Sequence, residues 1–367
     1  MTWTPPPYPY DRLAPLRDKA AALPGGLVDL SIGDPTDAPP PAVVAALSSS
    51  GAERSYPTSV GSPEFRAAAS AWLADRLNVV VPTSLIGACV GTKEFVAGLP
   101  GWLRLRDPSR DTVLFPAVSY PTYAMGAVLA GCRAVAVPVD TSGCLVLASV
   151  DEADAARALC LWVNSPGNPA GGLDDLDAAA AWGRARGVPV ISDECYVEFT
   201  WRGPRRTILG AGLEGVIALH SLSKRSNLAG IRSGFYAGDP DLMAFLLELR
   251  KHAGLMTPGP VLAAATVALS DQAHVDAQRE RYWERLNRLR DIVALAGAEA
   301  PLPGGGFYLW VPAPDGDDWG FVERLATEGG LLGSPGEFYG EAGRGHVRLA
   351  AVAPLDRLDL VASRLAG

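Results

Sequence analysis

Short apolar runs alternate with helical patterns from Pro41 to about Leu269, and this alternation restricts the chain to few folds. The apolar runs are too short for helices and are bounded by Gly, Pro and Asp, so we interpret them as buried strands. Strands and helices in alternation predict an α/β fold. Its mainly parallel sheet would carry helices on both faces and a ligand site at the carboxyl ends of the strands. The predicted strands lie at 85–91, 111–117, 132–139, 158–164, 188–194, 215–221 and 231–238, and the predicted helices at 63–77, 93–105, 123–131, 173–187 and 239–254.

The two ends of the chain follow other patterns. The first 40 residues are rich in proline, and we interpret them as an extended arm with a short helix from Asp11 to Ala22. The aromatic residues of this arm, Trp3 among them, need a second surface, either the body of the protein or another subunit. After residue 270 a long helix, two strands and two shorter helices predict a smaller α+β lobe. We expect an arm with part of the small domain at 1–40, a large domain at 41–270 and a small domain at 271–367.

Composition argues against several classes of partner. The 367 residues include 32 Lys and Arg against 40 Asp and Glu, a net charge of −8, with no basic run. We therefore expect no binding to nucleic acid or to anionic membranes. No apolar run approaches the roughly 20 residues of a membrane helix, and the N-terminus lacks a signal-peptide pattern. The five cysteines have no CxxC spacing, which disfavours disulfides and a metal site and favours a cytoplasmic protein.

The segment from His220 to Phe235, HSLSKRSNLAGIRSGF, holds the most informative lysine. Lys224 follows a predicted buried strand, where an amine loses hydration, has a lowered pKa and can form a Schiff base with an aldehyde. Ser221 and Arg232 lie close enough in sequence to hold a phosphate, the arginine through two parallel N–H donors. A lysine imine beside a phosphate site is what pyridoxal phosphate requires, although most loop lysines simply face water.

Two further strand ends carry polar residues that suit the same cofactor. Asp193 ends the strand in VPVISDECYVEF, and Tyr196 is three residues on. A carboxylate at this depth would keep a pyridinium nitrogen protonated, although an Asp at a strand end often only caps a turn. In WVNSPGNPAGG the turn explains the Pro and Gly residues but does not require Asn168, whose amide can donate to the phenolate oxygen of the cofactor.

The segment CVGTKEF predicts a strand, a glycine and a helix start. The backbone N–H groups of Gly91, Thr92 and Lys93 then point outward at the positive end of a helix dipole, which suits a phosphate. The segment is not GxGxxG and no acidic residue follows at the ribose position, so NAD is disfavoured, and no Walker P-loop is present. Tyr120 can stack on a planar ring or pack in the core.

In this order and spacing the motifs resemble the fold-type I pyridoxal-phosphate enzymes, specifically the class I and II aminotransferases. The resemblance covers nearly the whole chain and implies a large domain with a mainly parallel sheet between helices, plus a smaller α+β domain. It implies that Lys224 holds the cofactor as a Schiff base, and that Asp193 and Tyr196 contact the pyridine nitrogen and the phenolic oxygen. It further implies phosphate contacts from Thr92, Lys93, Ser221 and Arg232, ring contacts from Tyr120 and Asn168, substrate-carboxylate contacts from Gly33, Asn168 and Arg348, and a contact from Tyr56 across a homodimer with shared active sites.

Longer segments, such as SYPTSVGSPEFR, SDECYVEFTW and RKHAGLMTPGPV, are similar to actinobacterial succinyldiaminopimelate aminotransferases. That similarity implies ping-pong transfer of an amino group between L-glutamate or 2-oxoglutarate and N-succinyl-2-amino-6-oxopimelate, in the diaminopimelate branch of lysine biosynthesis. One residue departs from the family pattern, and the orientation of another is left open. Ala170 replaces a hydroxyl residue of the family turn, which removes a turn hydrogen bond but no catalytic group. Strand alternation alone does not decide whether Arg348 faces the cleft.

Three alternatives remain at this point. One is an aminotransferase of another amino acid, or a pyridoxal-phosphate lyase, on the same fold; the others are a nucleotide-dependent oxidoreductase and a non-catalytic sensor. The residues that would recognise a succinyl group are not identified, because most surface cations face water. The cationic candidates are Lys19, Arg54, Arg225, Lys251 and His252.

Overall fold

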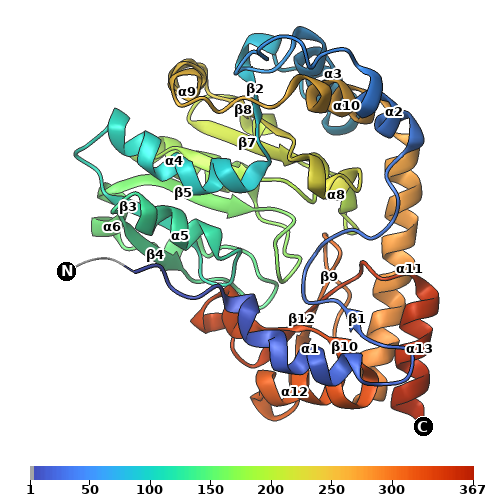
Figure 1. Ribbon diagram of the computed structural model, residues 1–367. Coiled ribbons are helices and arrows are strands. Elements are labelled where there is room, and N and C mark those ends of the chain that lie inside the picture. The colour runs from blue at the N-terminus through green and yellow to red at the C-terminus, as the bar shows by residue number, and fades with distance from the viewer. Residues whose placement is uncertain (1–3) are drawn as a thin grey trace.

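The computed structural model describes residues 4–367, and all seven predicted strands form one sheet (Figure 1). They are β2 (Ile86–Cys89), β3 (Thr112–Pro116), β4 (Arg133–Val137), β5 (Ala158–Asn164), β6 (Val190–Asp193), β7 (Val216–Ser221) and β8 (Gly234–Gly238). Their order across the sheet is β2-β8-β7-β6-β5-β3-β4. Strand β8 is antiparallel to its two neighbours, β2 and β7, and the other neighbouring pairs are parallel. The predicted fold class is confirmed.

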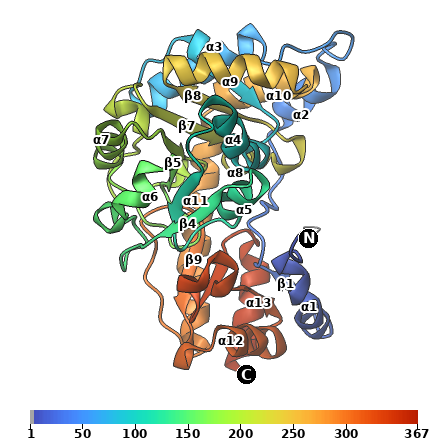
Figure 2. The same cartoon turned by 90° about the vertical axis from the view of Figure 1, so that its left-hand side faces the viewer.

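Helices cover both faces of this sheet (Figure 2). They are α2 (Pro41–Ser49), α3 (Pro63–Leu77), α4 (Thr92–Arg106), α5 (Thr122–Leu129), α6 (Glu152–Ala156), α7 (Leu176–Arg186), α8 (Leu222–Arg225), α9 (Pro240–His252) and α10 (Gly259–Ser270). Val163 of β5 packs in a cluster with α3, α7 and α10, whereas its neighbour Trp162 packs on the other face with α4, α5 and α9. Because both faces are buried, the strand is apolar throughout rather than alternating.

Local signals set several helix ends. The Ser62 hydroxyl accepts the backbone N–H of Phe65 at 3.1 Å and so caps the start of α3. The two glycines predicted as stops, Gly187 and Gly254, have φ angles of 59° and 70°. This left-handed conformation favours glycine and ends a helix, which is why the sequence could place these boundaries.

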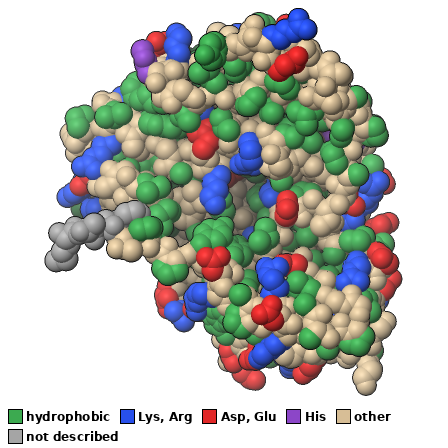
Figure 3. Space-filling model, in the orientation of Figure 1, with side chains coloured by type: hydrophobic (Ala, Val, Ile, Leu, Met, Phe, Trp, Pro, Cys, Tyr) green, Lys and Arg blue, Asp and Glu red, His purple; other side chains and the backbone are tan. Residues whose placement is uncertain are grey.

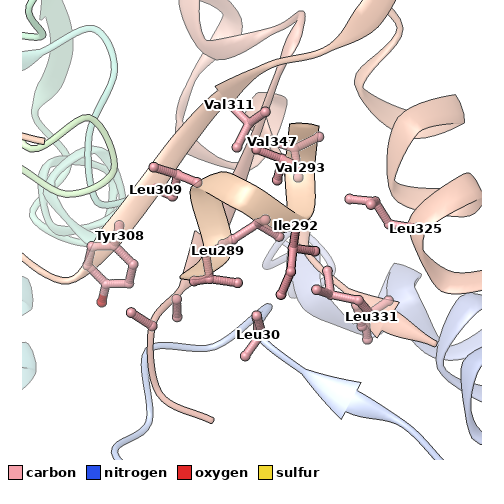
Figure 4. Packing of buried hydrophobic residues seen from close by; sticks show 14 of the residues in the cluster. Leu30, Leu289, Ile292, Val293, Tyr308, Leu309, Val311, Leu325, Leu331 and Val347 are labelled. Atoms are coloured by element: carbon pink, nitrogen blue, oxygen red, sulfur yellow. The ribbon is translucent and has the colours of Figure 1, made fainter. Parts of the chain in front are cut away.

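The C-terminal part of the chain forms a second lobe around its own apolar core (Figure 4). Its elements are α11 (Ala273–Leu295), β9 (Tyr308–Pro312), α12 (Asp318–Arg324), β10 (Leu331–Leu332), β11 (Ser334–Pro335), β12 (His346–Ala350) and α13 (Leu355–Ala366). Three strands make an antiparallel sheet in the order β11-β12-β9. Leu289 and Ile292 of α11 pack against Leu309 and Val347 of this sheet.

The N-terminal arm packs on this second lobe. A 3-10 turn, η1 (Pro9–Leu13), leads into α1 (Ala14–Ala21), and β1 (Val28–Asp29) pairs in parallel with β10. Leu13 and Leu16 are buried in the core of the second lobe. The surface that the arm covers therefore belongs to the same chain, although Trp3 lies outside the described residues. The domain boundaries after residues 40 and 270 stay a prediction.

No helix within residues 4–367 has the length and apolar character to cross a membrane. The five cysteines are free thiols, of which Cys89 and Cys160 are fully buried.

We predict that Leu13→Ala destabilises the fold by about 2–5 kcal/mol, because it opens a cavity where arm and second lobe meet. Leu295→Ala is the matched control, since Leu295 is half exposed and its truncation should change stability by less than about 0.5 kcal/mol. Urea unfolding followed by circular dichroism measures both. Equal effects of the two substitutions would show that the arm is not anchored through Leu13.

Candidate active site

The predicted site residues meet in a cavity of about 400 Å³ at the carboxyl ends of the parallel strands. The second lobe and the arm supply its other walls. The space-filling view shows a hollow near the middle of this face, with Lys and Arg side chains beside it (Figure 3). The predicted residues that line the cavity are Gly33, Thr92, Lys93, Tyr120, Asn168, Asp193, Tyr196, Ser221, Lys224, Arg232 and Arg348.

Lys224 lies in α8, directly after β7, and its amine points into the cavity. The amine donates a hydrogen bond to the backbone carbonyl of Gly33 in the arm. Burial lowers the pKa of Lys224 to about 8 from the usual 10.5, because the charged form loses hydration. A large fraction of the amine is therefore neutral near pH 8, which is the form that attacks a carbonyl carbon.

Asp193 ends β6 on the same edge of the sheet. Its carboxylate accepts the hydroxyl of Tyr123 at 2.8 Å and the backbone N–H of Cys195 at 3.2 Å. Tyr123 is itself fixed by a stacking contact with Trp162, with the ring centroids 5.0 Å apart. Burial raises the pKa of Asp193, so a positively charged ligand group facing it would stabilise the ionised form.

A second part of the cavity suits an anion. The helix α4 begins at Thr92, so its unpaired backbone N–H groups lie at the cavity wall. Gly91, before it, does not line the cavity, but any side chain there would overlap the guanidinium of Arg232. Arg232 itself has a left-handed backbone, with φ at 57°, which costs free energy in a non-glycine residue. Glycine at 91 thus makes room for a guanidinium next to a helix N-terminus.

A third part holds the buried guanidinium of Arg348. Only 3% of the surface of this residue is exposed. The guanidinium lies over the ring of Tyr308, 4.3 Å from its centroid, and donates to the side-chain oxygen of Asn168 at 3.0 Å and the backbone carbonyl of Ser31 at 2.6 Å. The structure therefore turns Arg348 toward the cavity, which strand alternation left open. The hydroxyl of Tyr308 also lies 2.9 Å from that of Tyr196.

Positive charge exceeds negative charge in this cavity. Its charged lining residues are Lys93, Lys224, Arg232 and Arg348 against one carboxylate, Asp193. Within residues 4–367, none of the four cations forms an ion pair. Lys93 and Arg232 are exposed, whereas Arg348 is buried and the Lys224 amine is desolvated. Enclosed cations without counter-ions are unfavourable, so the cavity suits a ligand with more than one negative group.

Some predicted residues lie outside the cavity. Tyr56 is 96% exposed on the surface of the chain. None of the five cations considered for a succinyl group lines the cavity. Lys19 pairs with Glu323, Lys251 pairs with Glu248, and Arg225 is buried beneath the site.

Several lining residues were missed by the sequence analysis. The arm contributes Tyr8, Tyr10 and Ile32, and the sheet helices contribute Tyr123. Tyr10 is held by a 2.9 Å contact between its hydroxyl and that of Tyr339. Tyr123 lies in the first turn of α5, whereas Tyr120 precedes that helix, so a shared helix face did not link the two residues. The tyrosines of the arm carry no periodic signal either, because proline-rich chain has no fixed periodicity.

A protein-family model described as aminotransferase class I and II matches residues 26–365. The chain belongs to this family. It is 43% identical to the 4-dedimethylamino-4-oxo-anhydrotetracycline transaminase OxyQ of Streptomyces rimosus, over 98% of this chain and 99% of that protein. It is 38% identical to a probable aminotransferase of Mycobacterium tuberculosis, over 98% and 85% of the two chains. The structure of a probable N-succinyldiaminopimelate aminotransferase from Thermus thermophilus superposes with a TM-score of 0.87 at 31% identity, covering 97% and 99%.

This aminotransferase therefore depends on pyridoxal phosphate, as its family does. The residues present fit that cofactor. A buried amine suits an aldehyde, the α4 N-terminus with Ser221 and Arg232 suits a phosphate, and a buried carboxylate suits a protonated ring nitrogen. The space kept free by Gly91 lets the guanidinium of Arg232 reach the phosphate position. The match also removes the oxidoreductase and sensor alternatives in favour of an enzyme that transfers amino groups.

We predict that borohydride reduction in the presence of pyridoxal phosphate labels Lys224 and not the other lysines, Lys19, Lys93 and Lys251. Labelling of cofactor-free protein should rise as the pH passes upward through about 8, because the amine loses its proton there. Peptide mass spectrometry locates the label, and Lys224→Ala is the control that should remain unlabelled. A label on another lysine in the wild-type protein would refute the assignment of Lys224.

Proposed function

We propose that this aminotransferase exchanges an amino group between L-glutamate or 2-oxoglutarate and N-succinyl-2-amino-6-oxopimelate, the succinyldiaminopimelate transaminase reaction of lysine biosynthesis. The observation that carries the amino-acid part is the buried guanidinium of Arg348, which has no carboxylate partner in the described chain and lines the same cavity as Lys224. The name of the Thermus structure supports the succinylated substrate, as do the longer sequence segments described above. Free cysteines support a reducing cytoplasm as the site of action.

Arg348 would hold the α-carboxylate of both substrates. Its planar guanidinium offers parallel N–H donors, and its contacts with Asn168 and Ser31 fix the plane in which they point. Gly33 lies at the same wall, where a side chain would overlap the hydroxyl of Tyr308. A substrate carboxylate can therefore approach the backbone of the arm as well as the guanidinium.

Lys224 would move the proton at the substrate's α-carbon. Bound pyridoxal phosphate supplies the electron sink that makes this carbon acidic. An amine with a pKa of about 8 accepts and returns a proton near neutral pH far more readily than an exposed lysine would. Asp193, oriented by Tyr123 and Cys195, would hold the ring nitrogen in its protonated form, and Tyr196 and Asn168 would face the phenolic oxygen.

A second candidate substrate is supported by the 43% identity to OxyQ, a transaminase of a tetracycline precursor. This identity exceeds that to the Thermus structure. The cavity wall formed by Tyr8, Tyr10 and Ile32 is aromatic and apolar, and it suits a large planar oxo compound as well as an aliphatic chain. An aminotransferase of such a compound is therefore the alternative.

We also propose a homodimer with shared active sites. Tyr56 is almost fully exposed although it is a large aromatic side chain, which suits a residue that contacts a second subunit. The contact would bring its hydroxyl to the phosphate end of the partner's cavity. Sedimentation equilibrium measures the mass, and a monomer at micromolar concentration would refute the proposal.

We predict that the yellow, cofactor-loaded enzyme loses its imine absorbance on adding L-glutamate and on adding N-succinyl-LL-diaminopimelate. It should regain the absorbance with 2-oxoglutarate, as ping-pong exchange requires. Alanine and aspartate are controls, and an anhydrotetracycline that carries a primary amine in place of the 4-oxo group tests the alternative. Bleaching by glutamate but not by the succinylated amine would contradict the proposed substrate while leaving an aminotransferase.

We predict that Arg348→Lys slows both half-reactions by roughly 10–100-fold, because an ammonium replaces a buried bidentate donor with a point charge. The cofactor spectrum should stay near wild type, since the phosphate site lies around Arg232 instead. Stopped-flow absorbance measures each half-reaction separately. If the variant loses bound cofactor to the same extent as it loses rate, Arg348 has a structural role. If both rates are unchanged, Arg348 does not bind the substrate.

A further inference from the structure

Two buried glutamates lie side by side behind the wall that carries Asp193, and their surroundings differ. Glu194 directly follows Asp193 at the end of β6, and Glu198 is four residues further on. Both side chains are essentially unexposed and line the same small internal cavity. This cavity is separate from the one that holds Lys224.

Glu198 is surrounded by positive charge. Its carboxylate lies 3.0 Å from Arg76, 3.2 Å from Arg205 and 3.5 Å from Arg225. The indole N–H of Trp72 also donates to it at 2.8 Å. These partners compensate the carboxylate of Glu198 for its loss of hydration.

Glu194 has no such partner. One carboxyl oxygen accepts the backbone N–H of Ile208 at 2.8 Å. The other oxygen has no hydrogen-bond partner within residues 4–367, and 3.4 Å away lies the Nε2 atom of His220, which also has none. No Lys or Arg in the described chain pairs with Glu194. A buried carboxylate without a cation is costly, so the neutral acid is the favoured form.

His220 is equally enclosed. Its ring packs between Trp72 and Phe235, with both centroid distances at 4.9 Å. It directly precedes Ser221 on β7, as Glu194 follows Asp193 on the neighbouring β6. Asp193, next to Glu194 in the chain, is a further carboxyl group close to it. The other titratable or charged groups around the pair are Cys195 on the same segment, and Glu198 and Arg225 across the small cavity. Burial raises the pKa of Glu194 to about 8 and lowers that of His220 to about 3.

We propose that Glu194 is held as the protonated acid, donates its hydrogen to neutral His220, and with it positions the two strand ends that carry Asp193 and Ser221. The positioning part rests on the proposed cofactor roles of those two residues. With Glu194 neutral, Asp193 is left as the charged carboxylate that faces the cofactor side of the wall. The hydrogen bond ties β6 to β7 at the point where both strands meet the site.

The charge state is tested first by nuclear magnetic resonance of protein labelled with nitrogen-15 at its four histidines. His220 should remain neutral from about pH 8 to about pH 6, a range over which an ordinary exposed histidine gains a proton. A His220→Asn variant assigns the signal. A doubly protonated His220 at about pH 6 would show an ion pair and overturn the proposal.

A matched pair of amide substitutions tests the same point through stability. Glu194→Gln replaces a neutral acid with a neutral amide and should leave the thermal midpoint of the cofactor-loaded protein unchanged. Glu198→Gln removes a charge from among three arginines and should lower the midpoint. If Glu194→Gln is as destabilising as Glu198→Gln, Glu194 is ionised and the proposal fails.

Cofactor affinity tests the positioning. Glu194→Met keeps the volume but cannot form the hydrogen bond, so it should raise the dissociation constant of pyridoxal phosphate about tenfold, while Glu194→Gln should not. His220→Leu should raise this dissociation constant by a similar factor. The double variant should bind the cofactor no more weakly than either single variant. A folded Glu194→Met protein with wild-type affinity would refute the positioning role. Failure of wild-type protein to bind the cofactor would instead refute the proposed function and leave the charge-state tests standing.

Discussion

An excess of positive charge in one cavity at the edge of the sheet is the constraint on which the site depends. Lys224, Arg232 and Arg348 reach the cavity from different elements, and Asp193 supplies the opposing carboxylate. Burial removes hydration from Lys224 and Asp193, which lowers the pKa of the lysine and raises that of the carboxyl. Anionic ligands relieve the cost of enclosing these cations, so the same electrostatics favour a phosphate-bearing cofactor.

The large domain was predictable because all of its strands except the edge strand β4 are buried on both faces. Such strands are continuous apolar runs, and β5 and β6 end in the polar residues that the sheet then brings to one edge. Asp193, Ser221 and Lys224 are all within a few residues of a strand end, so a local pattern was enough to place them.

The residues that orient this set were not predictable, because their contacts join distant parts of the chain. Tyr123 lies 70 positions before the Asp193 carboxylate that it contacts, and Tyr196 lies 112 positions before Tyr308. No spacing rule links such pairs. Arg348 shows the same limit: alternation gave two faces of β12, and only the packing of that strand against the arm decided which one meets the cavity.

The part of the cavity that differs most from the parallel sheet is the wall formed by the N-terminal arm, and we expect this wall to decide the choice of substrate. None of the five Lys, Arg and His residues considered for binding a succinyl group lines the cavity. Tyr8, Tyr10 and Ile32 of the arm do line it. The arm is held on the second lobe by Leu13 and Leu16, by the contact between Tyr10 and Tyr339, and by ion pairs such as Lys19 with Glu323. The lining residues Tyr8 and Ile32 are not among these anchors, so they can vary without disturbing the parallel sheet. Two relatives are named for an oxo-anhydrotetracycline and for N-succinyldiaminopimelate, and each matches nearly the whole of this chain. The arm is therefore the element in which their difference in substrate should be sought.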